Sequence, residues 1–346
     1  MIDLKDLTLV ELEALVETHG EPRYRAQQIA EWVFRKGAGS VEEFTNLPVR
    51  FRECLTRETV IGRLELVETT VSGRSDTAKH LWRLFDGQTV ETVLMRHGYG
   101  RTVCVSTQVG CRMGCRFCAS GLGGWVRHLR VGEIYDQVLA VQRVSGQTVT
   151  HIVLMGMGEP LDNYENVLKF VENVSAAYGL RISQRRITLS TCGLVPRIRD
   201  LARAGYSLTL AVSLHAPNNE LRNDLVPVNR KHPLEELIPA CAEYAALTGR
   251  RVSFEYALLG GLNDSPESAV ELADLLTGLL CHVNLIPANP VPEYDYSAPT
   301  PTAVRAFRRV LEQRGIPVSL RREMGADIGA ACGQLRRRYR PRGRKE

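Results

Sequence analysis

The sequence predicts an α/β fold: a parallel sheet with crossover helices, preceded by a small N-terminal helical domain. From about residue 102 onward, short runs rich in β-branched residues alternate with stretches of helical periodicity. Such an alternation is typical of parallel strands joined by crossover helices, in a sheet that is open or closed into a barrel. The chain has 346 residues, which is long enough for one large domain of this kind and a smaller accessory domain.

Residues 1–60 are expected to form a helical accessory domain that contacts RNA. Helices are predicted at 7–19, 24–35 and 48–57, and the second of them has a broad apolar side. Two strands are predicted at about 61–70 and 78–84, as a β-hairpin within a lead-in segment, 61–90. We therefore place the boundary of the core domain near residue 90.

Residues 91–332 are expected to form the core domain, and 333–346 a basic tail. The predicted strands are 102–106, 152–155, 186–190, 208–213, 252–256 and 283–286, and the predicted helices are 131–144, 164–178, 233–248, 266–280 and 302–313. In parallel sheets the reacting groups gather at the carboxyl ends of the strands. The segments richest in chemical groups follow this rule, because 111–118, 156–160, 191–193 and 214–215 come after the first four strands in turn.

The composition is that of a soluble globular protein. Apolar residues make up 44% of the chain and charged residues 24%. The N-terminus has no basic leader, and no stretch approaches the roughly 20 apolar residues of a membrane helix. The nine cysteines are odd in number and do not have the spacing of a secreted disulfide framework. We therefore expect a cytoplasmic protein in a reducing compartment.

The C-terminal tail carries the excess positive charge. Between Gly333 and Glu346 there are seven basic residues and one acidic residue, whereas the whole chain has a net charge of +5. Arginine-rich tails commonly contact the phosphates of nucleic acids. The alternative is a tail that is merely solvated.

Three cysteines, Cys111, Cys115 and Cys118, form a C-x3-C-x2-C motif on the loop after the first core strand. Three thiolates on one short loop can hold three irons of a four-iron cluster and leave the fourth iron open to a substrate. This is the spacing of the radical S-adenosylmethionine (SAM) enzymes, in which SAM chelates the open iron. The alternatives are a zinc site completed by a distant residue and three unrelated cysteines. Zinc ribbons normally have paired C-x2-C units, and the sequence has no second pair.

Two further cysteines lie in unusual surroundings. Cys104 is on the first core strand, and Cys332 is in a loop of small residues that a bulky partner can approach closely. Both also suit ordinary buried cysteines, which act as small hydrophobic residues. We assign no chemical role to the remaining cysteines outside the motif, Cys54, Cys192, Cys241 and Cys281.

Five sequence strings, in order, resemble the RlmN/Cfr family of radical SAM RNA methyltransferases. They are ETVLM at 91–95, CVSTQVGC at 104–111, LMGMGEP at 154–160, SLHAP at 213–217 and AACGQL at 330–335. Each string alone is modest evidence, but all of them in order are specific. The resemblance covers nearly the whole chain and implies a partial (β/α)6 barrel. Cys192 departs from the family pattern, because we expect a small or aliphatic residue after 190–191.

The resemblance implies the formation of 2-methyladenosine in 23S rRNA, at the peptidyl transferase centre, and in the anticodon arm of tRNA. It implies one [4Fe-4S] cluster and two SAM molecules per turnover. The first SAM methylates a cysteine that matches Cys332, and the second generates a radical that activates this methyl group for addition to C2 of adenine. Cys104 matches the cysteine that releases the product through a transient disulfide. Glu91 matches the proton acceptor.

The resemblance also implies a SAM-binding set. Its members are Gly158, Glu159, Ser190, Ser213, Leu214, His215 and Asn289. Backbone groups at Gly158 and the carboxylate of Glu159 can bind the SAM ammonium group. Met155 next to this turn can touch the reacting centre or be a core methionine. For His215, the alternative is an ordinary core histidine.

Two other functions remain open. A Cfr-type enzyme has the same cysteines and methylates C8 of the same rRNA adenosine, but the segments 95–100 and 324–327 look more like RlmN. A non-catalytic iron–sulfur or zinc RNA-binding module would leave the strand-end motifs unexplained. We further expect a monomer that receives electrons from a donor such as flavodoxin or ferredoxin.

Overall fold

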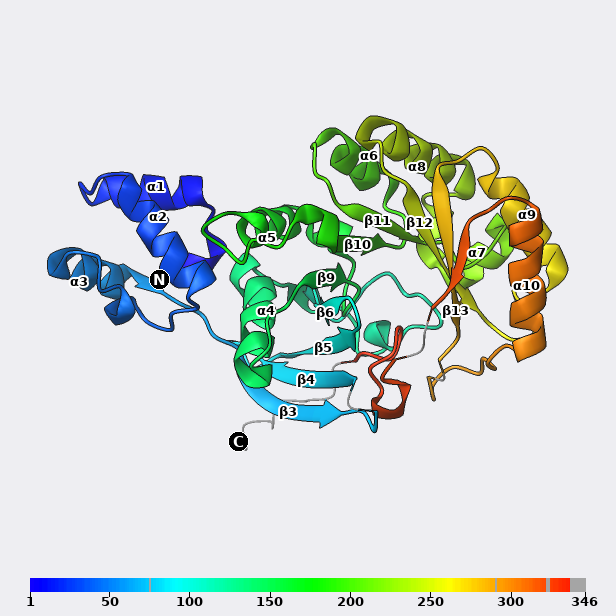
Figure 1. The fold of residues 1–346 in the computed structure, drawn as a ribbon, viewed down its shortest axis with the longest axis horizontal. Coiled ribbons are helices and arrows are strands. Elements are labelled where there is room, and N and C mark those ends of the chain that lie inside the picture. Colours follow the sequence, from blue (N-terminus) through cyan, green and yellow to red (C-terminus); the bar gives the residue numbers. More distant parts are fainter. Residues whose placement is uncertain (75, 290, 322–323, 337–346) are drawn as a thin grey trace.

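The computed structural model describes residues 1–74, 76–289, 291–321 and 324–336 (Figure 1). Of the predicted basic tail, 337–346 therefore lies outside the described residues. Within the described part of the chain, no helix is long and apolar enough to cross a membrane.

The six predicted core strands are confirmed and lie parallel in one sheet. They are β6 (Gly100–Cys104), β9 (His151–Leu154), β10 (Ile187–Thr191), β11 (Thr209–Ser213), β12 (Val252–Leu258) and β13 (Cys281–Pro287). Neighbouring strands in this order pair in parallel register. The result is the radical SAM fold, a curved and open α/β sheet (Figure 1).

One parallel strand was not predicted from the sequence. β14 (Val318–Leu320) pairs with β13 at one edge of the sheet. Its three residues are too few to show either an alternating or a continuous apolar pattern.

On the other side, the sheet continues into an antiparallel meander. β3 (Glu65–Val71), β4 (Thr77–Arg83) and β5 (Thr89–His97) join β6, so that the sheet runs from β14 to β3 without interruption. β5 was not predicted, because polar residues such as Thr92 are buried in it and obscure the pattern; Thr92 donates a hydrogen bond to Gln137. A domain boundary near residue 90 would fall inside β5, and this division stays a prediction.

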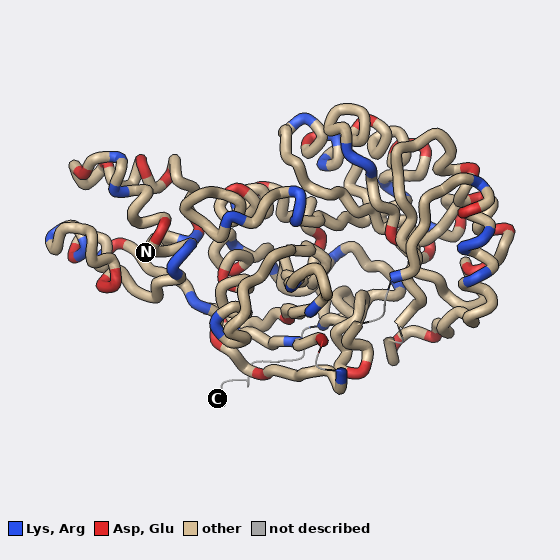
Figure 2. The backbone as a smooth tube through the Cα atoms, viewed as in Figure 1, with Lys and Arg blue, Asp and Glu red and all other residues tan. Residues whose placement is uncertain are grey.

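Crossover helices cover the outer face of the sheet (Figure 1). The five predicted core helices are present as α4 (Val131–Ser145), α5 (Tyr164–Ser175), α8 (Leu234–Thr248), α9 (Pro266–Leu276) and α10 (Pro301–Gln313). The structure adds α6 (Val195–Arg203) and α7 (Asn219–Leu225). The charged residues of α9 are all acidic, whereas those of α10 are mostly arginines (Figure 2). Arg314, directly after α10, pairs with Asp274 of α9.

The N-terminal helices α1 (Leu9–Thr18), α2 (Tyr24–Ala30) and α3 (Val49–Glu58) project to one side of the sheet (Figure 1). A π-helical turn, Glu31–Arg35, prolongs α2, and the short strands β1 (Ile2–Asp3) and β2 (Thr59–Val60) pair in parallel. Lys5 joins this unit to the core. Its Nζ lies 2.6 Å from Asp136 Oδ1 and 2.6 Å from the carbonyl oxygen of Gly62, with both charged side chains buried. A buried, hydrogen-bonded charge pair at this junction fixes α4 against the N-terminal segment.

Candidate active site

Two adjoining cavities lie along the parallel strands: an inner cavity at their carboxyl ends, and an outer cavity that extends from there to the starts of β9 and β10. The outer cavity has a volume of about 600 Å³ and the inner cavity about 170 Å³. Both are lined by Met155, Ile286, Asn289, Arg321 and Cys332. A group on the sulfur of Cys332 can therefore face either cavity.

The three motif cysteines line the inner cavity. Burial raises the pKa of the Cys111 thiol to about 12, and it raises the pKa of Cys115 and of Cys118 as well. Thiols in such surroundings ionise only when a cation compensates the charge, as iron does when it binds.

Among the described residues, no three His, Cys, Asp or Glu side chains converge to hold a single metal ion. A four-iron cluster needs a different arrangement, with one thiolate on each of three irons. Three partly buried thiols around one cavity fit that donor set.

The Gly-Glu-Pro turn after β9 packs tightly against the start of the cysteine loop. Gly158 has φ of +100°, and a Cβ atom there would lie 2.5 Å from Cβ of Gln108. The main-chain N–H of Glu159 donates to Gln108 Oε1 at 2.9 Å. Only glycine allows this approach, because both its backbone conformation and the available space exclude a side chain.

Glu159 is buried, and both carboxylate oxygens have main-chain partners. Leu161 N–H donates to Oε1 at 3.0 Å, and Cys192 N–H donates to Oε2 at 2.8 Å. Burial raises the pKa of Glu159, and these hydrogen bonds oppose the rise. Cys192 thus contributes through its backbone, while its thiol is buried in the same cavity wall.

His215 lies at the end of β11 in the left-handed conformation, with φ of +61°. Its Nδ1 accepts a hydrogen bond from Ala257 N–H at 2.9 Å, and its ring meets that of Phe117 edge-on. Burial, with a contribution from Arg222, lowers the pKa of His215 to about 3. The ring is therefore neutral at physiological pH, with its proton on Nε2 toward the inner cavity.

Most of the other predicted SAM contacts line the inner cavity. They are Gly158, Ser190, Ser213 and Asn289. Leu214 is different, because its side chain is fully buried in the core and its carbonyl oxygen accepts from Arg222. Any contact from Leu214 would have to come from its main chain.

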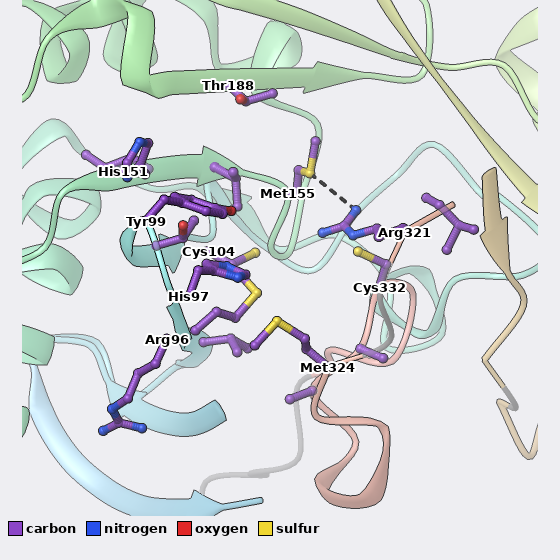
Figure 3. A pocket seen from close by; sticks show the side chains of 18 of the residues that line it. Arg96, His97, Tyr99, Cys104, His151, Met155, Thr188, Arg321, Met324 and Cys332 are labelled. Carbon is purple, nitrogen blue, oxygen red and sulfur yellow. Dashed lines mark hydrogen bonds between the residues drawn. The ribbon is translucent and has the colours of Figure 1, made fainter. Parts of the chain in front are cut away.

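Cys104 and Cys332 point into the outer cavity from opposite sides (Figure 3). Burial, followed by the nearby Cys332 thiol, raises the pKa of Cys104 to about 12, and the Arg321 guanidinium opposes this rise. The fold thus brings together two cysteines that are far apart in the sequence.

Arg321 is a site residue that sequence analysis missed. Its Nη1 donates to Met155 Sδ at 3.9 Å (Figure 3) and lies 3.8 Å from Oε2 of the buried Glu255. The nearby Cys332 thiol raises the pKa of Arg321, which keeps the guanidinium charged. Arg321 directly follows β14. Because this strand was not predicted, Arg321 could not be recognised as a residue at the end of a strand. Met155 lies at the junction of both cavities and is only partly buried.

The loop that carries Cys332 is attached to the cysteine loop. Ala119 N–H donates to the carbonyl oxygen of Gly333 at 2.7 Å, and Ser120 Oγ donates to that of Leu335 at 2.8 Å. Asn289 Nδ2 lies 3.4 Å from the carbonyl oxygen of Cys332. These bonds hold Cys332 where the two cavities meet.

Glu91 is buried under the same loop and is not among the lining residues of either cavity. Its Oε1 lies 3.3 Å from Lys79 Nζ, and its Oε2 accepts from Arg336 N–H at 2.8 Å. Its main-chain oxygen accepts from Ser106 Oγ at 2.7 Å. In this conformation the 329–336 segment lies over the predicted proton acceptor.

Comparisons with known proteins agree with this geometry. Residues 105–274 match the model of the radical SAM superfamily, and residues 2–61 match that of the ribosomal RNA large subunit methyltransferase N-terminal domain. A probable dual-specificity RNA methyltransferase RlmN of Desulforudis audaxviator is 73% identical, over 92% of this chain and 100% of that protein. Its counterpart in Pelotomaculum thermopropionicum is 60% identical, over 97% and 92%. A crystal structure of a radical SAM methyltransferase from Sphaerobacter thermophilus matches with a TM-score of 0.92 and 48% identity, over 97% and 99% of the two chains.

Proposed function

The chain belongs to the RlmN family of dual-specificity radical SAM RNA methyltransferases, and on this premise we propose that it forms 2-methyladenosine in 23S rRNA and in the anticodon arm of tRNA. One observation carries the proposal. Cys332 lines both cavities, so the same sulfur can receive a methyl group on one side and present it to a base on the other. C2 of adenine is too electron-poor to attack SAM directly, and a carrier sulfur that can be activated by a radical removes this difficulty.

In this proposal Cys111, Cys115 and Cys118 hold one [4Fe-4S] cluster. SAM binds beside them, against Gly158, Glu159, Ser190, Ser213, His215 and Asn289, with Leu214 contributing main-chain groups. The bound cofactors supply a methyl group to Cys332 from one SAM molecule and a hydrogen-abstracting radical from a second. The buried, neutral His215 and the tight turn at Gly158 favour a dry cavity in which such a radical is protected from side reactions.

In the remaining steps, Cys332 carries the methyl carbon to the base and Cys104 releases the product. The activated methyl carbon on Cys332 would form a bond to C2 of adenine, the adduct would return its unpaired electron to the bound cluster, and the C2 proton would pass to Glu91. The thiolate of Cys104 attacks the sulfur of Cys332, forming an S–S bond and breaking the bond between that sulfur and the new carbon. The electron pair left on the carbon takes up a proton and completes the methyl group, and an external thiol reduces the disulfide before the next turnover.

Arg321 supports this step, because its guanidinium opposes the rise in the pKa of Cys104 that burial causes. Glu91 cannot take the C2 proton directly in the conformation described above. Since the 329–336 segment covers its carboxylate, this segment has to shift, or a water molecule has to carry the proton, when RNA is bound.

The remaining assignments concern partners and location. We propose that the protein acts as a cytoplasmic monomer, with an electron donor such as flavodoxin or ferredoxin. The requirement for SAM and a cluster follows from the family. The spacing of the three cysteines also indicates the cluster without reference to the family.

The test is the product. 23S rRNA and tRNA from a strain that lacks 2-methyladenosine are incubated with reconstituted enzyme, SAM and a reductant, then digested and analysed by mass spectrometry. We expect 2-methyladenosine in both RNAs, with one 5′-deoxyadenosine per methyl group. 8-Methyladenosine would instead identify a Cfr-type enzyme, and the absence of SAM cleavage would identify a non-catalytic RNA-binding module.

A further inference from the structure

The outer cavity carries, at the start of β9, a cluster of aromatic rings that the proposed chemistry does not use. The His97 and Tyr99 rings at the tip of the β5–β6 hairpin are stacked, with centroids 4.7 Å apart and planes 5° apart. His151 at the start of β9 meets Tyr99 edge-on, at 5.4 Å and 83°. All three residues line the outer cavity (Figure 3), yet Tyr99 is 71% exposed.

The position of this hairpin tip is fixed by its contacts with β9. Arg101 N–H donates to Thr150 Oγ1 at 2.9 Å, and Thr150 N–H donates to the carbonyl oxygen of Arg101 at 2.9 Å. Gly100, with φ of +150°, lies so close that a Cβ atom would be 2.3 Å from Thr150 Oγ1. The exposed ring of Tyr99 is therefore held in place by packing and not by its own burial. A preorganised aromatic face loses little entropy when a flat ligand stacks on it.

The charges around the rings are of one sign. Among the lining residues that the structure describes there are four arginines, at 96, 185, 186 and 321, and no carboxylate. Arg185 and Arg186 come from the short 3-10 helix before β10 and are exposed, and both line the outer cavity. A cavity with an aromatic face and several guanidinium groups suits a ligand with flat rings and phosphates.

We propose that Tyr99, backed by His97, stacks on a base adjacent to the target adenosine, while Arg185 and Arg186 bind the neighbouring phosphates. This inference rests on the proposed function, because it assumes that the target adenine enters the outer cavity to reach Cys332. A base that leaves its stack exposes one face of the neighbouring base. A protein ring that stacks on this face offsets part of the free-energy cost of unstacking. The subsite is sequence-tolerant, since every base has a π face, and it therefore suits an enzyme with two RNA substrates.

Three variants at position 99 separate stacking from other effects. Tyr99→Phe keeps the ring and should bind RNA like the wild type, whereas Tyr99→Ala and Tyr99→Leu should bind about 5- to 150-fold more weakly. The probe is an RNA hairpin with the sequence of a substrate tRNA anticodon arm, and binding is measured by fluorescence anisotropy. Two further hairpins carry an abasic residue on the 5′ or the 3′ side of the target adenosine. With one of these two, the wild type and Tyr99→Leu should bind equally.

The arginine pair is tested by the salt dependence of binding. The double variant Arg185→Ala/Arg186→Ala should reduce the slope of log K against log salt by up to about 0.7 for each phosphate that is no longer bound. Arg309→Ala, an exposed arginine on α10, is the matched control and should leave the slope unchanged.

The outcomes distinguish this inference from the proposed function. Methylation of Cys332, read from the mass of the intact protein, requires no RNA and should be normal in every Tyr99 variant. If Tyr99→Leu binds all three hairpins like the wild type, or if it remains weaker than the wild type with both abasic hairpins, the stacking subsite is refuted. If the wild type binds the hairpin but forms no methylated adenosine, the proposed function fails, while the binding comparison still decides the subsite.

Discussion

Lys79 and Glu91 form a buried ion pair beneath the loop that carries Cys332. Their Nζ and Oε1 atoms are 3.3 Å apart, and the side chains are 4% and 1% exposed. Each partner also holds one end of the loop, because Lys79 Nζ donates to the carbonyl oxygen of Gly329 at 3.0 Å and Glu91 accepts from Arg336 N–H. The pair thus links the predicted proton acceptor to the position of the methyl-carrying cysteine.

We predict that the two members of this pair are energetically coupled. Lys79→Met removes the ammonium group beside the buried Glu91 carboxylate and should lower the free energy of unfolding by about 3–5 kcal/mol. The double variant Lys79→Met/Glu91→Gln removes both charges and should recover part of this loss. A double-mutant cycle with Glu91→Gln, measured by denaturant unfolding, should give a coupling energy of about 1–3 kcal/mol. Additive effects would show that the ion pair contributes nothing specific.

The same variants test the role of Glu91 in the reaction. In Glu91→Gln the new amide oxygen can still accept from Arg336 N–H, so the loop keeps a partner, but the side chain can no longer take a proton. We expect normal methylation of Cys332 and a loss of RNA methylation of at least about 100-fold, the usual scale of general-base catalysis. Normal turnover in Glu91→Gln would exclude it as the proton acceptor.

Gly158 is predicted to be essential for SAM binding. In Gly158→Ala the new Cβ meets Gln108 at 2.5 Å in addition to the strain of a positive φ, so the Gly-Glu-Pro turn has to move. Gly146→Ala is the matched control, since Gly146 also has a positive φ, of +64°, but nothing lies within 4 Å of its Cβ position. By equilibrium dialysis, SAM affinity should fall at least about tenfold in Gly158→Ala only. If Gly158→Ala bound SAM as tightly as Gly146→Ala, the close contact between position 158 and Gln108 would not be needed for SAM binding.

Cys111→Ala, Cys115→Ala and Cys118→Ala should each abolish the four-iron cluster and SAM cleavage, because two thiolates cannot hold it in the open-site geometry. Iron and sulfide content, absorbance after anaerobic reconstitution and 5′-deoxyadenosine formation are the measurements. Cys54→Ala, in the N-terminal helix α3, is the control and should retain all three. A motif variant with a full cluster and normal SAM cleavage would refute the ligand assignment.

Sequence patterns predicted those parts of the molecule that depend on local periodicity or spacing. The parallel strands are short runs rich in β-branched residues, and the cysteine motif is a local feature of one loop. β5 escaped prediction because Glu91 and Thr92 are polar residues buried by contacts with distant parts of the chain. Glu91 could be named only through the family resemblance, since Arg336, which covers it, is 245 residues away. Arg321 and the ring cluster at Tyr99 follow from tertiary packing, for which a single sequence contains no periodic signal.

The basic tail is predicted to bind RNA phosphates. Deleting 337–346 removes six of the seven basic tail residues but keeps Arg336, whose main chain contacts Glu91. The truncated protein should therefore retain its cluster and methylate Cys332 normally. Its RNA affinity should be lower, and the salt dependence should flatten by up to about 0.7–0.9 for each phosphate that the tail would have bound. An unchanged slope would show that the tail is only solvated.

Cys332 and Cys104 should fail at different steps when they are replaced. Cys332→Ala has no sulfur to carry the methyl group and should form no covalent complex with RNA. Cys104→Ala should still methylate Cys332 and cleave SAM, but it should accumulate protein joined to RNA, because thiolate attack on the Cys332 sulfur is the step that releases the product. The two side chains face one cavity, as a transient disulfide requires, since its Cα atoms have to come within roughly 7 Å. The complex is measured by denaturing gel electrophoresis and by mass spectrometry after nuclease digestion. Normal turnover of Cys104→Ala without an adduct, or the same adduct in Cys332→Ala, would overturn this division of roles.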